Sequence, residues 1–170
     1  NNLVVSTVMS NLGFELALKR KSIQMLRTNV GDRYVLEAMI KHGGILGGEQ
    51  SGHIILLDYN NTGDGLITAL MLLKIMLDTG KSLETLGSEV AKYPQILVNI
   101  PVLDKNSFGR DLYLGELIEK EEKNLSDRGR ILVRPSGTEP LVRVMVEALD
   151  KDEMNDVAER ISSEIRKRLC

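Results

Sequence analysis

Residues 131–146 read ILVRPSGTEPLVRVMV, and this stretch decides the fold of the second half of the chain. Two runs rich in Val, Ile and Leu, residues 131–133 and 141–146, enclose a loop that contains two prolines and a glycine. Short apolar runs bounded by such breakers are typical of strands. The stretch therefore predicts two strands joined by a tight connection at the edge of a sheet.

The loop carries groups that suit a phosphate. Arg134 offers a planar fork of donors that matches two phosphate oxygens, and Ser136 and Thr138 add hydroxyl donors. Gly137 permits a positive φ and a close backbone approach, so neighbouring N–H groups can form an anion nest. Strand alternation can point Arg143 the same way. The competing interpretations are a plain turn, which Pro, Ser and Gly usually form, and a solvent-facing Arg143.

A second polar cluster, residues 48–53, reads GEQSGH and lies between two apolar runs. Glu49 and Ser51 on such a short loop can hydrogen-bond vicinal sugar hydroxyls, with the carboxylate as a charge-assisted acceptor. The alternatives are a polar hairpin tip and, for His53, a structural histidine. His42 is the second of two histidines and no cysteine lies nearby, so the residue types argue against a metal site.

The pattern of residues 1–93 predicts an α/β domain with a mixed sheet and flanking helices. A strongly apolar segment, residues 65–78, predicts a core helix because apolar residues occupy most of its sides. Asp32 is expected to cap the helix that follows it. The alternating strands and helices expected before that segment are residues 3–9, 12–19, 23–27 and 32–42.

After Pro94 the pattern changes to β-α-β-β-α, which predicts a small α+β domain over residues 94–170. An antiparallel sheet with helices on one face is expected. The first helix is predicted at residues 112–125, and Asp150 is expected to cap the second, with Glu153 completing a capping box.

The totals narrow the function classes. The formal charge of −2 argues against broad nucleic-acid binding, which needs a basic surface. A single cysteine, Cys170, excludes a disulfide framework within the chain. No signal peptide or membrane-spanning run is found, so a cytoplasmic protein with no membrane partner is expected.

Together the two loops, in this order, resemble those of the α-D-phosphohexomutase superfamily, and the resemblance covers essentially all 170 residues. Gln50 and residues 30–35, VGDRYV, resemble the bacterial phosphoglucosamine mutase branch. The phosphomannomutase and phosphoglucomutase branch usually has Met in place of Gln50 and Gly-His where this chain has Gly31-Asp32. The resemblance implies that residues 1–93 are the third, sugar-binding domain of four, and residues 94–170 the fourth, phosphate-binding domain.

The resemblance also implies roles for individual residues. The residues expected to face the sugar are Glu49, Ser51 and His53. The residues expected to hold the non-reacting phosphate are Arg134, Ser136, Gly137, Thr138 and Arg143. Asp32 and Arg33 are expected as further cleft residues.

The implied reaction interconverts glucosamine 6-phosphate and glucosamine 1-phosphate through a phosphoserine and a bisphosphate intermediate, assisted by Mg²⁺. The sequence contains neither the serine loop nor the aspartate-rich metal loop. We therefore expect a C-terminal recognition half, inactive alone, whose partners are a hexosamine phosphate and two domains preceding Asn1. A homodimer is left open. The alternatives are part of a phosphomannomutase or phosphoglucomutase, and a non-catalytic phosphosugar-binding module.

Overall fold

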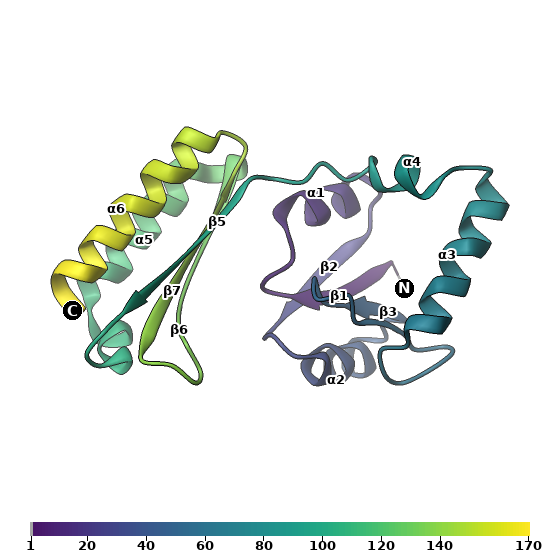
Figure 1. Ribbon diagram of the computed structural model, residues 1–170, viewed down its shortest axis with the longest axis horizontal. Helices are drawn as coiled ribbons and strands as arrows, with labels where there is room; N and C mark the ends of the chain where they lie inside the picture. The colour runs from purple at the N-terminus through teal and green to yellow at the C-terminus, as the bar shows by residue number, and fades with distance from the viewer. Residues whose placement is uncertain (1) are drawn as a thin grey trace. The chain divides into compact units, whose positions relative to one another are not determined.

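A computed structural model describes residues 2–170 of the chain (Figure 1). The chain divides into two compact units, residues 1–92 and 93–170. Along the described residues, no helix combines the length and the apolar character that crossing a bilayer requires.

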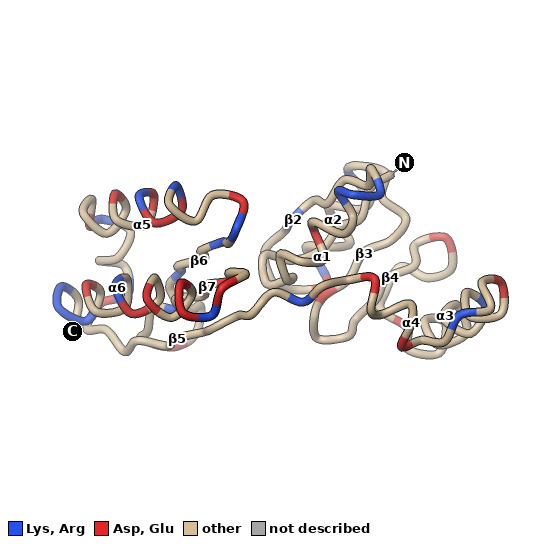
Figure 2. The backbone as a smooth tube through the Cα atoms, turned by 90° about the horizontal axis from the view of Figure 1, so that it is seen from above, with Lys and Arg blue, Asp and Glu red and all other residues tan. Residues whose placement is uncertain are grey.

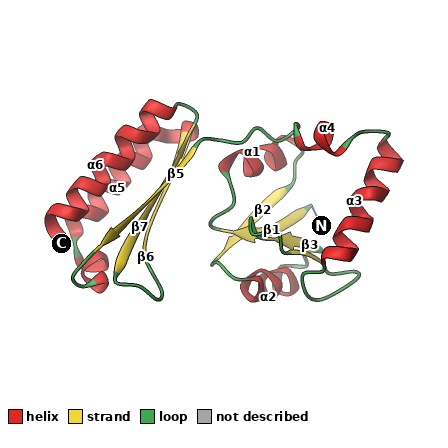
Figure 3. Cartoon of the chain, in the orientation of Figure 1, coloured by secondary structure: helices red, strands yellow, loops and turns green. Residues whose placement is uncertain are grey.

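The first unit is a four-stranded mixed sheet with helices on both faces, as the sequence predicted (Figure 3). Its strands are β1 (Leu3–Thr7), β2 (Gln24–Thr28), β3 (Leu46–Gly48) and β4 (Ile54–Leu56). Its helices are α1 (Leu12–Arg20), α2 (Asp32–His42), α3 (Gly65–Thr79) and α4 (Leu83–Gly87). The strand order is β2-β1-β3-β4. β1 runs parallel to β2 and β3, while β4 is antiparallel to β3.

The core of this unit forms around Val5 of the central strand β1. Val35 and Met39, one turn apart on α2, pack in the same cluster with Ile55 of β4, and all four side chains are at most 1% exposed. Gly47 of β3 makes this approach feasible, because a Cβ there would lie 2.5 Å from the Met39 sulfur. Helix α2 therefore rests directly on the sheet.

Helix α3 contradicts its prediction as a core helix. None of its residues is buried, and Leu66 and Leu77 are 72% and 84% exposed. The helix contacts the edge strand β4, and its two charged residues, Lys74 and Asp78, pair with each other. An apolar composition indicates that burial of the helix surface is favourable, but it does not specify which element packs against that surface.

The second unit is an antiparallel three-stranded sheet with two long helices on one face, which confirms the predicted β-α-β-β-α arrangement (Figure 1). Its strands are β5 (Gln95–Pro101), β6 (Gly129–Pro135) and β7 (Leu141–Ala148), in the order β5-β7-β6. Its helices are α5 (Leu112–Leu125) and α6 (Lys151–Leu169). Two short 3₁₀ turns, η1 (Lys105–Arg110) and η2 (Ser126–Arg128), flank α5.

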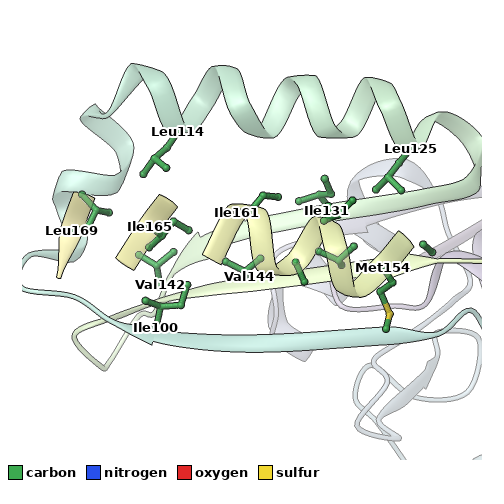
Figure 4. Close-up of a cluster of buried hydrophobic side chains, with 14 of the residues drawn as sticks. Ile100, Leu114, Leu125, Ile131, Val142, Val144, Met154, Ile161, Ile165 and Leu169 are labelled. Carbon is green, nitrogen blue, oxygen red and sulfur yellow. The ribbon is translucent and has the colours of Figure 1, made fainter. Parts of the chain in front are cut away.

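The core of the second unit lies between this sheet and its helices (Figure 4). Val142, Val144 and Val146 alternate along β7 and are fully buried, as expected for one face of a strand. Ile161 and Ile165, at helical spacing on α6, are buried in the same cluster. The opposite face of β7 therefore carries Arg143, Met145 and Glu147.

Side-chain caps define where the helices of this unit begin. Asp111 accepts a hydrogen bond from the N–H of Leu114, and Asp150 accepts from the N–H of Glu153. The Glu153 carboxylate pairs with Arg128, 2.7 Å away, instead of closing the expected capping box. Both helices carry interleaved charges of both signs (Figure 2), which is typical of solvent-facing surfaces.

Candidate functional site

The loop between β6 and β7 is held in shape by its own hydrogen bonds. The N–H of Ser136 donates to the carbonyl of Leu141 over 2.8 Å, and the N–H of Leu141 donates to the carbonyl of Glu139 over 2.9 Å. The Ser136 hydroxyl accepts from the N–H of Glu139 over 3.3 Å, and Ser136 is 3% exposed. Ser136 therefore stabilises the loop from inside, while Gly137 and Thr138 are exposed.

Two arginines face each other at the base of this loop. Arg134 of β6 and Arg143 of β7 are register partners, so their side chains lie on the same face of the sheet. Arg143 pairs with Glu139 over 2.8 Å, and its Nε is buried without a hydrogen-bond partner. Along residues 2–170, the side chain of Arg134 makes no hydrogen bond or ion pair. Two opposed cations, of which only Arg143 is paired with a carboxylate, leave a positive site that favours an anion.

Backbone donors extend this positive site. Within the described part of the chain, the N–H groups of Gly137 and Thr138 donate no hydrogen bond. Gly137 is not among the described glycines with positive φ, which contradicts that expectation. A Cβ at Gly137 would meet no atom within 4 Å, so the glycine leaves open space beside two free donors. Free N–H groups next to open space are suited to contact a phosphate oxygen.

Sequence reasoning missed Lys105 at the start of η1. Its ammonium group donates to the carbonyl oxygens of Ser136 and Gly137, over 2.8 and 3.0 Å. These partners are 31 and 32 residues away along the chain, so no local pattern could have indicated the contact. The end of the same loop is tied to the same segment, because Val102 N–H donates to the Pro140 carbonyl.

In the first unit, the tip between β3 and β4 brings the three predicted sugar-facing residues together. Glu49 and His53 lie close, with 3.9 Å between Oε2 and Nδ1, and the Ser51 hydroxyl lies 3.3 Å from the same ring nitrogen. The Glu49 side chain is 12% exposed, whereas that of His53 is 62% exposed. A largely buried carboxylate beside two exposed polar groups can accept a hydrogen bond from a hydroxyl.

Glu49 is also held by a residue that was not predicted to matter there. Its Oε1 accepts a hydrogen bond of 2.8 Å from the N–H of Gly31. Gly31 has φ +132°, a conformation that favours glycine. It is also the N-cap of α2, so the expectation that Asp32 caps this helix is wrong. The hydrogen bond from Gly31 ties the start of α2 to the tip between β3 and β4.

The side chains of Asp32 and Arg33 interact with residues close to them in the sequence. Asp32 accepts from the N–H of Arg33 over 2.8 Å, and Arg33 pairs with Glu37 over 2.8 Å. The hydrogen bond that Arg33 donates to the Glu37 carboxylate raises the pKa of Arg33. The predicted branch marker Gln50 lines, with Glu49, an apolar groove of about 440 Å³ along β1 and β3. Among residues 2–170, no group of three or more His, Cys, Asp or Glu side chains could hold a metal ion.

Family models match both units. Residues 1–93 match phosphoglucomutase/phosphomannomutase, alpha/beta/alpha domain III, and residues 88–164 match the C-terminal domain of the same family. The phosphoglucosamine mutase of Carboxydothermus hydrogenoformans is 54% identical over 98% of this chain, and that of Bacillus pumilus is 51% identical over 99%. The chain spans 38% of the length of each of these relatives.

Solved structures share the fold. An N-acetylphosphoglucosamine mutase from Aspergillus fumigatus superposes with a TM-score of 0.85 at 20% identity, over 97% of this chain and 38% of that one. A second structure of that enzyme, in complex with GlcNAc-6P and magnesium, has a TM-score of 0.72 at 21% identity, over 97% of this chain and 42% of that one. At these identities the likeness concerns the fold alone.

Proposed function

The chain belongs to the phosphoglucomutase/phosphomannomutase family, and from this membership we propose that it is the substrate-recognition part of a phosphoglucosamine mutase. The whole enzyme would interconvert glucosamine 6-phosphate and glucosamine 1-phosphate in the cytoplasm. The single observation that carries the proposal is the unpaired Arg134 opposite Arg143, beside the free N–H groups of Gly137 and Thr138. This is a site for a dianionic phosphate.

In the proposal, the loop between β6 and β7 holds the phosphate that does not react. The Arg134 guanidinium donates two parallel hydrogen bonds to phosphate oxygens. Arg143 neutralises further charge, and the N–H groups of Gly137 and Thr138 bind a third oxygen. Ser136 supports the loop and would contact the ligand only through its remaining O–H donor.

The tip between β3 and β4 recognises the sugar. Gly31 occupies Oε1 of Glu49, so Oε2 is the oxygen left to accept from a sugar hydroxyl or amino group. Ser51 and His53 are exposed next to it and supply further polar contacts. Asp32 and Arg33 remain proposed cleft residues at the start of α2.

The phosphoryl-transfer step itself is assigned to residues outside this chain. Phosphoryl transfer needs a nucleophile and neutralisation of charge, usually by a metal ion. The proposed phosphoserine, the bisphosphate intermediate and the Mg²⁺ site therefore concern parts of the enzyme beyond this chain. Within residues 2–170, no group of three or more His, Cys, Asp or Glu side chains fits a Mg²⁺ site. What this chain contributes is positioning, since binding energy from a distant phosphate orients the reacting end.

The test is a titration of the chain, followed by amide NMR shifts, with glucosamine 6-phosphate, glucose 6-phosphate and inorganic phosphate. Arg134→Ala should weaken binding by about tenfold or more, because a charge-assisted contact contributes about 1.5–3 kcal/mol. Arg110→Ala, a change to another arginine of the same unit, should leave affinity unchanged. An affinity that is the same in Arg134→Ala and in the wild-type chain would contradict the proposed phosphate site.

The same titration separates the alternatives. A preference for glucosamine 6-phosphate over glucose 6-phosphate supports the amino-sugar mutase, and the reverse preference favours a phosphoglucomutase or phosphomannomutase. A non-catalytic module would bind phosphosugar yet give no turnover when the chain is tested within a full-length protein. The chain alone is expected to be inactive.

A further inference from the structure

We propose that Lys105 is a positioning residue that aims the phosphate-binding N–H groups, on the premise that the loop between β6 and β7 binds phosphate. The observation is that one ammonium group bonds two successive carbonyls of that loop, those of Ser136 and Gly137. Lys105 is partly buried and lies at the start of η1. Its side chain therefore reaches the loop from a neighbouring segment of the same unit.

Peptide planarity turns these two contacts into a constraint on donors. The carbonyl of Ser136 shares a peptide plane with the N–H of Gly137, and the carbonyl of Gly137 shares one with the N–H of Thr138. In a trans peptide the C=O and N–H bonds point in opposite directions. Because Lys105 holds both carbonyls, both N–H groups point away from it. They are the same two groups that donate no hydrogen bond along residues 2–170.

The position of Lys105 is itself fixed. Asp104 caps η1, accepting from the N–H of Asn106 over 2.9 Å and from the Ser107 hydroxyl over 3.1 Å. These bonds contribute to a lowered Asp104 pKa, the backbone bond from Asn106 being the largest cause. On the other side, the N–H of Val102 bonds the Pro140 carbonyl over 3.0 Å. The backbone at Lys105 is therefore held in place, and so is the end of the loop that Lys105 contacts.

The ammonium group does not compete with the proposed ligand contacts. Its hydrogen-bond acceptors are the two carbonyl oxygens, which lie on the opposite edge of each peptide unit from the two N–H groups. A phosphate that binds the N–H groups would meet donors already oriented, so less conformational entropy would be lost on binding. Lys105 thus acts through the loop and supplies long-range positive charge without being a ligand itself.

The first experiment needs no ligand. Residual dipolar couplings of the Gly137 and Thr138 amides are measured in the wild-type chain and in Lys105→Met, Lys105→Arg and Lys120→Met. Lys105→Met should change the couplings of both amides, whereas Lys105→Arg, which keeps charged donors, should retain most of the wild-type values. Lys120→Met removes an exposed lysine of α5 and should change nothing. Unchanged couplings in Lys105→Met would overturn the inference.

The second experiment uses inorganic phosphate as the probe. Lys105→Met should weaken binding about tenfold, Lys105→Arg should restore it to within about threefold, and Lys120→Met should match wild type. Urea titration of each variant controls for folding. If Lys105→Met and Lys105→Arg have the same stability and only Lys105→Arg restores phosphate affinity, the loss of affinity in Lys105→Met is not caused by unfolding. Wild-type affinity in Lys105→Met, with binding lost in Arg134→Ala, would refute the role of Lys105 and leave the phosphate site standing. If Arg134→Ala also binds normally, the phosphate site fails, and the couplings alone decide whether Lys105 orients the loop.

Discussion

Replacing Arg134 by Met should stabilise the ligand-free protein while it removes phosphate binding. The change deletes one of two cations that face each other on β6 and β7, yet keeps most of the apolar stem of the side chain. Register partners have Cβ atoms about 4.5–5.5 Å apart. Two guanidinium charges roughly 6 Å apart repel by about 0.7 kcal/mol in water and about 2.8 kcal/mol at an effective dielectric constant of 20.

The expected gain is at the lower end of that range. Glu139 cancels part of the Arg143 charge, and the Arg143 side chain is 31% exposed, so solvent screens the repulsion. We expect the free energy of unfolding to rise by about 0.5–1 kcal/mol at low salt. Because the Debye length falls to about 3 Å at 1 M salt, the gain should nearly vanish there.

The assay is urea unfolding followed by amide NMR signals of β6 and β7, since the chain has two units that need not unfold together. Arg134→Lys is the matched control, because it keeps the charge and loses the bidentate fork. It should therefore bind phosphate poorly without any gain in stability. A destabilised Arg134→Met variant at low salt, or a gain that is the same at 1 M salt, would refute the reasoning.

Three further variants test other parts of the description. Gly31→Ala should lower the free energy of unfolding by roughly 1–3 kcal/mol, because φ at this position is +132°, which an alanine adopts only with strain. It should also shift the NMR signals of Glu49, and a variant as stable as wild type would contradict this backbone conformation. Gly137→Ala should leave the urea midpoint unchanged, since a Cβ there meets open space, but should weaken phosphate binding, and a lowered midpoint would show that the glycine is structural. Glu89 has a pKa lowered from 4.5 to about 2, first by hydrogen bonds from two lysines, so its contribution is present above pH 4.5 and is lost as the pH falls toward 2. Glu89→Gln should flatten thermal stability against pH in that window, and an unchanged acid profile would argue against this carboxylate.

Local signals accounted for much of the fold. Helix α5 has the predicted bounds, because an Asp at its N-cap and a regular apolar stripe both act within a few residues. The antiparallel sheet of the second unit likewise follows from short apolar runs between breakers. Helix α3 was predicted as a core helix from composition alone, and the structure leaves it exposed, because composition carries no information about which surface lies nearby.

The candidate site was accessible from sequence only in part. The opposed arginines could be anticipated, since both loop residues and strand alternation are local. The bond from Gly31 to Glu49 spans 18 residues and that from Lys105 to the loop spans more than 30. Both depend on a backbone group, an N–H in one case and C=O groups in the other, whose presence does not identify the side chain, so no residue pattern could have indicated them.

The exposed surface of α3 has a practical consequence for anyone who works with this polypeptide. Leu66, Leu70, Leu73 and Leu77 are each more than half exposed on an ordered helix. Dyes such as ANS, whose fluorescence is ordinarily a sign of loosened tertiary packing, should therefore bind the fully native chain and fluoresce. Dye-based melting curves would begin from a high signal, and circular dichroism or NMR is the sounder way to follow its unfolding.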